Sequence, residues 1–102
     1  MATLKELLDA LHEDERLSTD GEIARAVKLI CRVQAMNSGE RDTIRAAFRD
    51  GPLYDGDVPN KSARDALLEE GMMAKVVMRG QDGFNACTHR GAWAYRLLEA
   101  GA

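Results

Sequence analysis

The sequence predicts a mainly helical α+β fold for a single domain of residues 1–102. Three observations support this prediction. Apolar residues recur at helical spacing in successive segments, glycine, proline and asparagine separate those segments, and two short β-prone runs flank a glycine-containing turn near residue 80. A chain of 102 residues suffices for one modest core. We expect a helical extension over residues 1–37 and a core unit over residues 38–102.

The amino-terminal extension is predicted to hold two helices. The patterns Thr3-x-x-Glu6 and Thr19-x-x-Glu22 are capping boxes, in which the two side chains satisfy free backbone N–H groups of the first helical turn. Apolar residues at positions i, i+3, i+4 and i+7 then mark the face of each helix that is expected to be buried. The predicted helices are residues 4–15, with Leu4, Leu7, Leu8 and Leu11 inward, and 20–36, with Ile23, Ala26, Val27, Ile30 and either Val33 or Gln34 inward.

A third helix is predicted over residues 39–50, with Ser38 as its cap. Gly51 and Pro52 end it, because glycine adopts left-handed backbone angles and proline cannot continue a helix. Arginines spaced four residues apart form a stripe on this helix. The stripe is either a solvated face paired with acidic neighbours, or a contact surface for a phosphate backbone or an acidic protein. Its members are Arg41, Arg45 and Arg49, and the inward residues are Ile44, Ala47 and Phe48.

The segment 53–59 is too short and too rich in breakers for a helix, so a loop is expected there, attached to the core by Leu53 and Val58. Either Asp57 or Asn60 then caps a fourth helix, which ends before Gly71. This helix is predicted over residues 60–70, with Ala63, Ala66 and Leu67 inward and Lys61, Ser62, Arg64, Asp65 and Leu68 outward.

A β-hairpin is predicted after the fourth helix. Its strands are residues 74–79 and 84–87, and its turn is residues 80–83. The register of the second strand stays open, because a bulge in the turn would move Phe84 from one face of the sheet to the other. Thr88 is then expected to cap a last helix over residues 89–100.

Charge is distributed unevenly along the chain. The formal net charge is −3, and residues 1–24 alone carry −5, which leaves +2 for the rest. Proteins that bind nucleic acid generally show a clear basic excess, since neutralised phosphates release counterions. No apolar run is long enough to cross a bilayer and no secretion signal is present, so we expect a cytoplasmic protein that does not enter a membrane.

No set of residues predicts catalysis, a cofactor or a metal. Cys31 and Cys87 lie in apolar periodic segments and are expected to be buried free thiols. Cys87 and His89 offer two metal ligands, but no second pair has zinc-type spacing. The pair Asp55 and Asp57 lacks the remainder of a calcium loop and is better explained as a turn. We therefore expect no enzyme activity.

From residue 40 to residue 100 the chain resembles the winged helix-turn-helix domains of MarR-like and related small transcription regulators. The likeness is carried by residues 66–72, Ala-Leu-Leu-Glu-Glu-Gly-Met, by the hairpin, and by Thr88-His89-Arg90-Gly91. Residues 56–65 also look like small phage-encoded proteins. The resemblance implies a winged helix with two additional N-terminal helices, a C-terminal helix and one two-stranded β-hairpin wing. It implies base contacts from Lys61, Ser62 and Arg64 and backbone contacts from Arg79 and Gln81.

Two functions follow from these patterns. The first is a small, non-catalytic transcriptional regulator that binds double-stranded DNA sequence-specifically, with a homodimer as one possible state. The rival is a phage-type winged-helix module that binds a host protein. It is favoured by the net acidity and by residues 53–58, where the family has a complete helix. The predicted DNA contacts are Asn60, Lys61, Ser62, Arg64 and Asp65 of the fourth helix, Arg79 and Gln81 of the hairpin, and the stripe of Arg41, Arg45 and Arg49.

Overall fold

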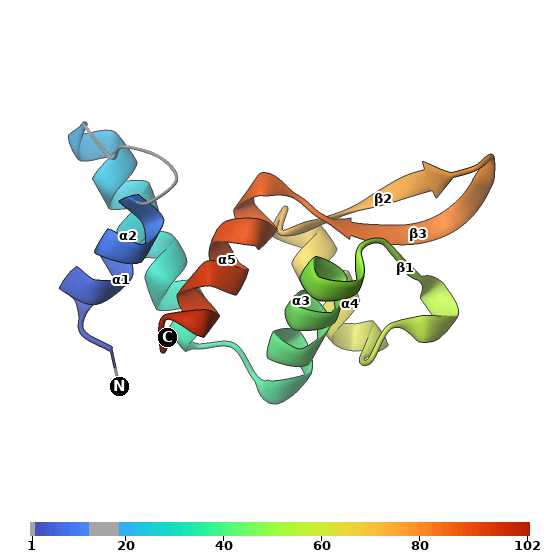
Figure 1. Ribbon diagram of the computed structural model, residues 1–102, viewed down its shortest axis with the longest axis horizontal. Coiled ribbons are helices and arrows are strands. Elements are labelled where there is room, and N and C mark those ends of the chain that lie inside the picture. The colour runs from blue at the N-terminus through green and yellow to red at the C-terminus, as the bar shows by residue number, and fades with distance from the viewer. Residues whose placement is uncertain (1, 13–18) are drawn as a thin grey trace. The chain divides into compact units, whose positions relative to one another are not determined.

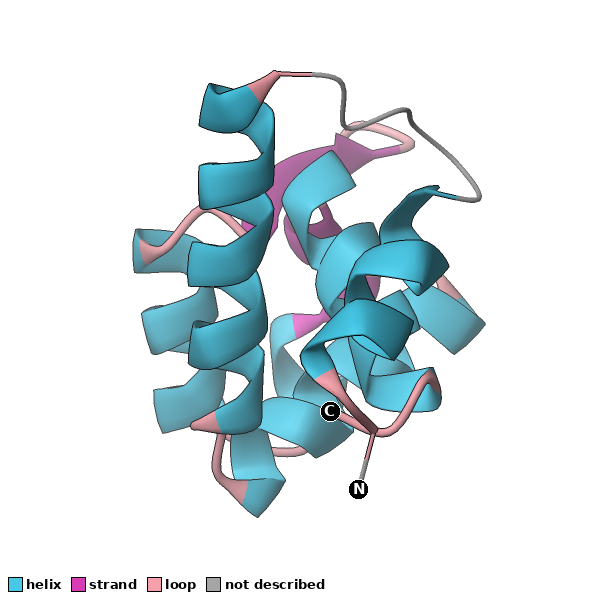
Figure 2. Ribbon diagram, turned by 90° about the vertical axis from the view of Figure 1, so that its left-hand side faces the viewer, coloured by secondary structure: helices cyan, strands magenta, loops and turns pink. Residues whose placement is uncertain are grey.

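The computed structural model describes residues 2–12 and 19–102 (Figure 1). Helices account for most of the described chain and strands for a small part (Figure 2). The chain forms two compact units. The first comprises residues 1–36 together with 96–102, and the second comprises residues 37–95.

The first unit contains α1 (Leu4–His12) and α2 (Asp20–Gln34). The predicted capping box of α1 is confirmed, because Thr3 Oγ1 accepts the Glu6 N–H at 3.2 Å and the Glu6 carboxylate accepts the Thr3 N–H at 3.3 Å. Thr19 Oγ1 likewise accepts the Glu22 N–H at 3.2 Å and caps α2. The predicted extension of the first helix over residues 13–15 lies outside the described residues.

The predicted inner faces of α1 and α2 are confirmed beyond the first turn of each helix, although Leu8 and Val27 are only half-buried. Leu4 is 50% exposed and Ile23 is 38% exposed, so the prediction that both face inward is wrong. Helical side chains tilt toward the amino terminus, and those of a first turn therefore project past the packed part of the helix. The alternative between Val33 and Gln34 is resolved in favour of Val33. The buried residues of this pair of helices are Leu7, Leu11, Ala26, Leu29, Ile30 and Val33.

The second unit contains a three-stranded antiparallel sheet, so the predicted two-stranded hairpin is incomplete. The third strand is the short β1 (Leu53–Tyr54), which pairs with β3 through Leu53 opposite Asn85 and Tyr54 opposite Phe84. Two residues carry no periodic signal, which is why the sequence pattern predicted only a loop here. The sheet order is β1-β3-β2 (Figure 1). The elements in chain order are α3 (Ser38–Asp50), β1, the 3₁₀ turn η1 (Asp55–Asp57), α4 (Lys61–Glu69), β2 (Met73–Met78), β3 (Gln81–Cys87) and α5 (His89–Glu99).

Side chains define where α3, α4 and α5 begin. The cap of α3 is Asn37 rather than the predicted Ser38, because Asn37 Oδ1 accepts the Glu40 N–H at 2.8 Å and Glu40 accepts the Asn37 N–H at 3.1 Å. Asn60 rather than Asp57 caps α4, since its side-chain oxygen accepts the Ala63 N–H at 2.8 Å. Thr88 caps α5, as predicted.

The hairpin turns over two residues, Arg79 and Gly80, rather than the predicted residues 80–83. Both have positive φ, 52° and 77°, as a type I′ turn requires. The register shifts between Val76, which pairs with Phe84, and Met78, which pairs with Gln81, so Asp82 and Gly83 form a bulge in β3. The bulge that the sequence left open is therefore present.

The core of the second unit lies between α3, α4 and the base of the sheet. Leu53 and Val58 are buried and attach the loop to this core, as predicted. Phe48 was expected to face inward but is 40% exposed, and its ring stacks on Tyr95 with centroids 4.0 Å apart. The other buried side chains of this unit are Glu40, Thr43, Ile44, Ala47, Ala63, Leu67, Met72, Met73, Asn85 and Ala94.

Candidate nucleic-acid interface

The first turn of α4 presents two of the predicted contact residues to solvent. Lys61 and Ser62 are both exposed. Lys61 makes no ion pair with any described residue, so its ammonium is available to an anion. Asn60 precedes them and is also exposed, but its side-chain oxygen is occupied by the capping bond to Ala63. Two of the predicted contacts thus remain accessible at the start of this helix.

Arg64 and Asp65, which were predicted to contact DNA together, bond to each other. One terminal nitrogen of Arg64 lies 2.9 Å from Asp65 Oδ1, and the other lies 3.0 Å from Asp55 Oδ1. The Arg64 side chain is only 15% exposed. Its guanidinium therefore connects α4 to η1, whereas a base contact would need it to point outward.

Asp55 is the centre of this polar cluster, which the sequence patterns did not predict. Besides Arg64, its Oδ1 accepts bonds from the Lys75 ammonium at 2.5 Å and from Asn85 Nδ2 at 2.9 Å. The amide of Asn85, and then the ammonium of Lys75, hold the pKa of Asp55 at about 2 rather than its usual 3.8. Asn85 is fully buried and also donates to the Leu53 carbonyl at 3.0 Å. The cluster therefore joins η1 to α4, β2 and β3.

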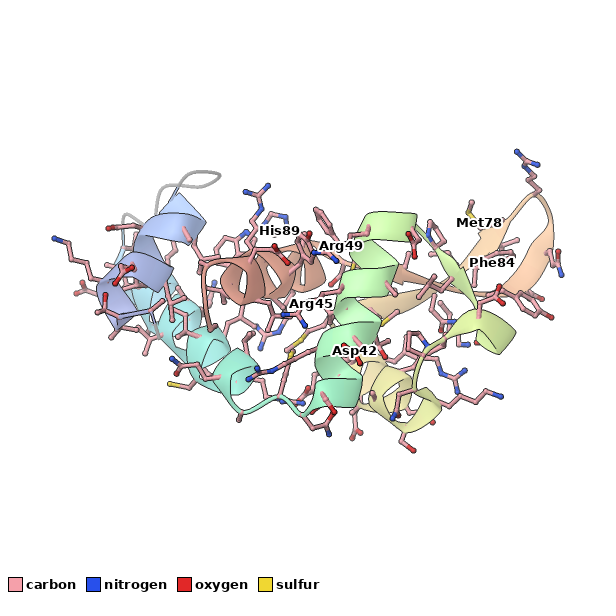
Figure 3. All side chains as sticks on the ribbon, turned by 60° about the horizontal axis from the view of Figure 1, so that its bottom comes forward. Asp42, Arg45, Arg49, Met78, Phe84 and His89 are labelled. Carbon is pink, nitrogen blue, oxygen red and sulfur yellow. The ribbon has the colours of Figure 1, made fainter. Side chains whose placement is uncertain are left out.

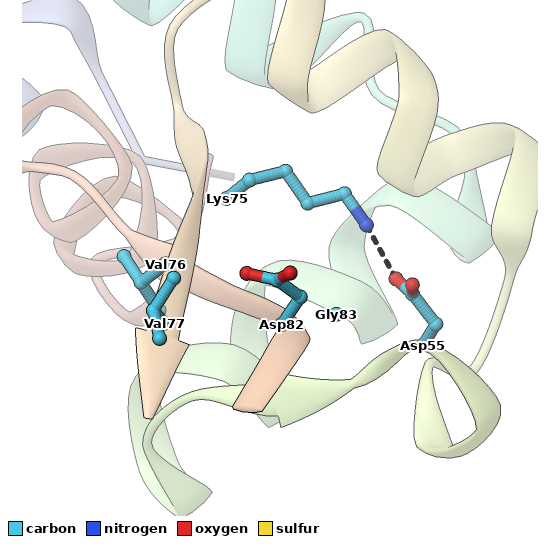
Figure 4. A pocket seen from close by; sticks show the side chains of 6 residues that line it. All are labelled: Asp55, Lys75, Val76, Val77, Asp82 and Gly83. Atoms are coloured by element: carbon cyan, nitrogen blue, oxygen red, sulfur yellow. Dashed lines mark hydrogen bonds and ion pairs between the residues drawn. The ribbon is translucent and has the colours of Figure 1, made fainter. Parts of the chain in front are cut away.

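A groove of about 420 Å³ lies beside the Asp55 cluster, along the outer part of the hairpin. Its lining combines charged and apolar groups (Figure 4). Arg79 and Gln81, the predicted backbone contacts, are exposed at the tip of the same hairpin. The residues that line the groove are Asp55, Lys75, Val76, Val77, Asp82 and Gly83.

The predicted arginine stripe of α3 lies partly against α5. Arg49 Nε donates to the Tyr95 hydroxyl at 3.1 Å, and its guanidinium carbon lies 5.6 Å from the centre of that ring. Arg45 and Arg49 project from the same side of α3 (Figure 3). Arg41 and Arg45 are half-buried. The stripe thus contributes to packing within the unit, which neither sequence alternative foresaw.

The charge balance of the second unit is slightly acidic. Residues 37–95 carry 8 basic and 9 acidic side chains, a formal net charge of −1. Asp57, Asp65 and Asp82 are all exposed near the candidate contacts. Any contact with phosphate therefore depends on a few individually placed cations, since the unit as a whole does not attract an anion.

The cysteines differ from the prediction in one case. Cys31 is exposed, because it lies beside the apolar stripe of α2 and not within it. Cys87 is half-buried, with its sulfur 4.0 Å from the Ile44 carbonyl oxygen, and burial raises its thiol pKa to about 11. Across residues 2–12 and 19–102, no group of three or more potential ligands is placed to hold a metal ion, and no helix could span a membrane.

Comparisons with known proteins give no relative for this arrangement. The chain matches no family model, no curated protein and no solved structure.

Proposed function

We propose that residues 37–95 form a winged-helix unit and that the protein is a small regulator that binds double-stranded DNA. The observation that carries this proposal is the path of the chain. α3 is followed by β1, η1, α4 and the β2–β3 hairpin, and the strands lie in the order β1-β3-β2. A helix that leads directly into a two-stranded hairpin is suited to enter a major groove while the hairpin lies along the neighbouring backbone.

The accessible contact residues lie on α4 and on the tip of the hairpin. Lys61 and Ser62 would contact base edges or phosphates from the first turn of α4. Arg79 and Gln81 would contact the backbone. Arg64 takes a different role in this proposal, because its bond to Asp55 fixes η1 against α4. In this proposal η1 occupies the position that a complete helix has in the winged helix-turn-helix family that the sequence resembles.

A protein-binding module is the second candidate function. It is favoured by the net charge of −1 and by the exposed acidic groups Asp57, Asp65 and Asp82 beside the proposed contacts. Under this alternative the unit keeps the same fold but repels duplex DNA, and its partner carries basic groups.

Binding to random duplex DNA at two salt concentrations separates the two candidates. We expect retention at low salt and release at higher salt, since each phosphate contact contributes about 0.9 to the slope of log K against log salt. The double variant Lys61→Ala, Arg79→Ala should lower that slope by roughly 2.

The matched control removes two exposed lysines from the first unit, Lys5→Ala with Lys28→Ala, and should leave the slope near that of the natural chain. Wild-type protein that flows through at low salt would contradict DNA binding and support the protein-binding module. An equal loss in both double variants would show that total charge, and not the surface of α4 and the hairpin, causes the retention.

A further inference from the structure

The strand β2 has one edge that no described strand occupies. In the order β1-β3-β2 it pairs only with β3. Natural proteins usually protect such an edge with charged side chains, proline or a bulge. Here the bulge lies in β3, residues 73–78 contain no proline, and their single charge, Lys75, is paired with Asp55. The free edge of β2 is therefore open to another strand.

The side chains of β2 also leave apolar surface exposed on both faces of the hairpin. On one face Val76 and Met78 lie beside Phe84 and Tyr54, whose rings meet edge to face with centroids 5.4 Å apart. Met78 and Phe84 are labelled on the hairpin in Figure 3. On the other face Val77 is 61% exposed and lines the groove (Figure 4). A strand added at this edge would extend both apolar faces.

We infer that the free edge of β2 pairs with the same edge of a second copy, antiparallel and about a two-fold axis through Val76. A pairing of this kind is isologous, so each contact occurs twice. Residues directly opposite each other in the pair point to the same face of the sheet. The apolar faces of the two copies therefore continue into each other only when the numbers of the paired residues are both even or both odd. The two-fold axis then passes through a residue and not between two residues. An axis at Lys75 sets Lys75 opposite itself, and an axis at Val77 sets Lys75 opposite Arg79; like charges directly opposite are destabilising.

The axis at Val76 avoids both repulsions and adds an attraction. It sets Lys75 of one copy opposite Val77 of the second copy, and Val77 lies across from the bulged Asp82. The Asp82 carboxylate is exposed and makes no ion pair with any described residue. The Lys75 ammonium has three donors and can turn toward the Asp82 carboxylate of the second copy. Asp55 then still keeps its bonds to Arg64 and Asn85.

This inference goes beyond DNA binding and does not depend on it, because self-association is measured on the protein alone. Sedimentation over a wide range of protein concentration should show a dimer. Val77→Lys should raise the dissociation constant at least about tenfold, which corresponds to about 1.4 kcal/mol, because the introduced ammonium would face Lys75 of the second copy. Val77→Glu should retain the dimer, because it places opposite charges in the same pair.

Ile23→Lys is the matched control, since it changes an exposed β-branched residue of α2 to lysine and should leave the dimer intact. Far-ultraviolet circular dichroism checks that every variant is folded. In the dimer, the amide protons of residues 73–78 that point to the free edge should exchange more slowly than in dilute monomer, whereas those bonded to β3 are already protected. The inference would be overturned if the wild-type protein were a monomer at all concentrations, or if both Val77 variants or neither of them lost the dimer. Loss of the dimer in Ile23→Lys, or no added protection of the amides on the free edge of β2, would also overturn it.

Discussion

Gly91 lies in the first turn of α5, where its Cα faces the turn between α4 and β2. A Cβ at this position would lie 2.0 Å from the Met72 carbonyl oxygen and 3.4 Å from the Cys87 Cβ. The Gly91 N–H also donates to the capping Thr88 hydroxyl at 3.1 Å. The sequence pattern Thr88-His89-Arg90-Gly91 predicted the cap, whereas the requirement for glycine comes from the approach of Met72.

Gly91→Ala should therefore destabilise the protein, by about 1–3 kcal/mol, because backbone must move to admit the methyl group. Thermal unfolding followed by circular dichroism measures the change. The matched control is Gly21→Ala in α2, where the nearest atom to the new Cβ is 4.0 Å away. That substitution should leave stability unchanged or raise it by up to about 1 kcal/mol. Equal melting temperatures for the two variants would contradict the close approach at Met72.

The two thiols should react at very different rates. Cys31 is exposed, whereas Cys87 is half-buried and its thiol pKa is raised to about 11, so little of the reactive thiolate forms near neutral pH. Iodoacetamide should modify the folded protein once rapidly, at Cys31, as mass spectrometry of the peptides shows. Cys31→Ser should abolish the rapid modification, and denaturant should expose both sites of the natural chain. Rapid labelling of Cys87 in the folded state would contradict its burial.

At the scale of elements, the helices and the hairpin were largely predictable, whereas the short strand and the polar cluster were not. A capping box acts within four residues, so Thr3 with Glu6 is visible in the sequence. The bonds of Asp55 reach Lys75 and Asn85, 20 and 30 residues away. Local spacing does not specify which residues meet over such separations, and the sequence accordingly indicated only a turn.

Asp55→Asn should lower the free energy of unfolding at neutral pH and make that free energy depend less on pH in the acidic range. The pKa of Asp55 in the folded protein is about 2, below its ordinary 3.8, so its contribution is present above pH 3.8 and is lost as the pH falls through about 2. Urea unfolding at a series of pH values measures this, and the two proteins should converge in the most acidic samples. Asp57→Asn, in the same η1, is the control. If Asp55→Asn showed the same free energy of unfolding as the natural chain at every pH, the hydrogen bonds assigned to Asp55 would be contradicted.

At the scale of the whole molecule, charge is the property that most limits the proposed function. The chain carries a formal net charge of −3, and Asp57 and Asp65 lie exposed close to Lys61 and Ser62. Electrostatic repulsion between a protein of this charge and duplex DNA weakens their encounter. The location of the acidic groups, and not only their number, should therefore govern binding.

A pair of charge-reversal variants tests this point. Asp57→Lys with Asp65→Lys, and Asp9→Lys with Asp20→Lys, both change the formal net charge from −3 to +1. We expect the first variant to gain at least about tenfold affinity for duplex DNA at low salt, and the second to gain less, because only the first places cations beside α4. Fluorescence anisotropy of labelled duplex measures both. Equal gains would show that the surface around α4 has no special role.

The sequence by itself determined the mainly helical α+β class, the order of the helices, the caps at Thr3, Thr19 and Thr88, and the presence of a hairpin. These features depend on hydrogen bonds and side-chain periodicity within a few residues, which a linear pattern contains. Tertiary structure alone decided the pairing of β1 with β3 and the capture of Arg64 by Asp55. Each depends on which distant segments pack together, and that follows from the free energy of the entire fold.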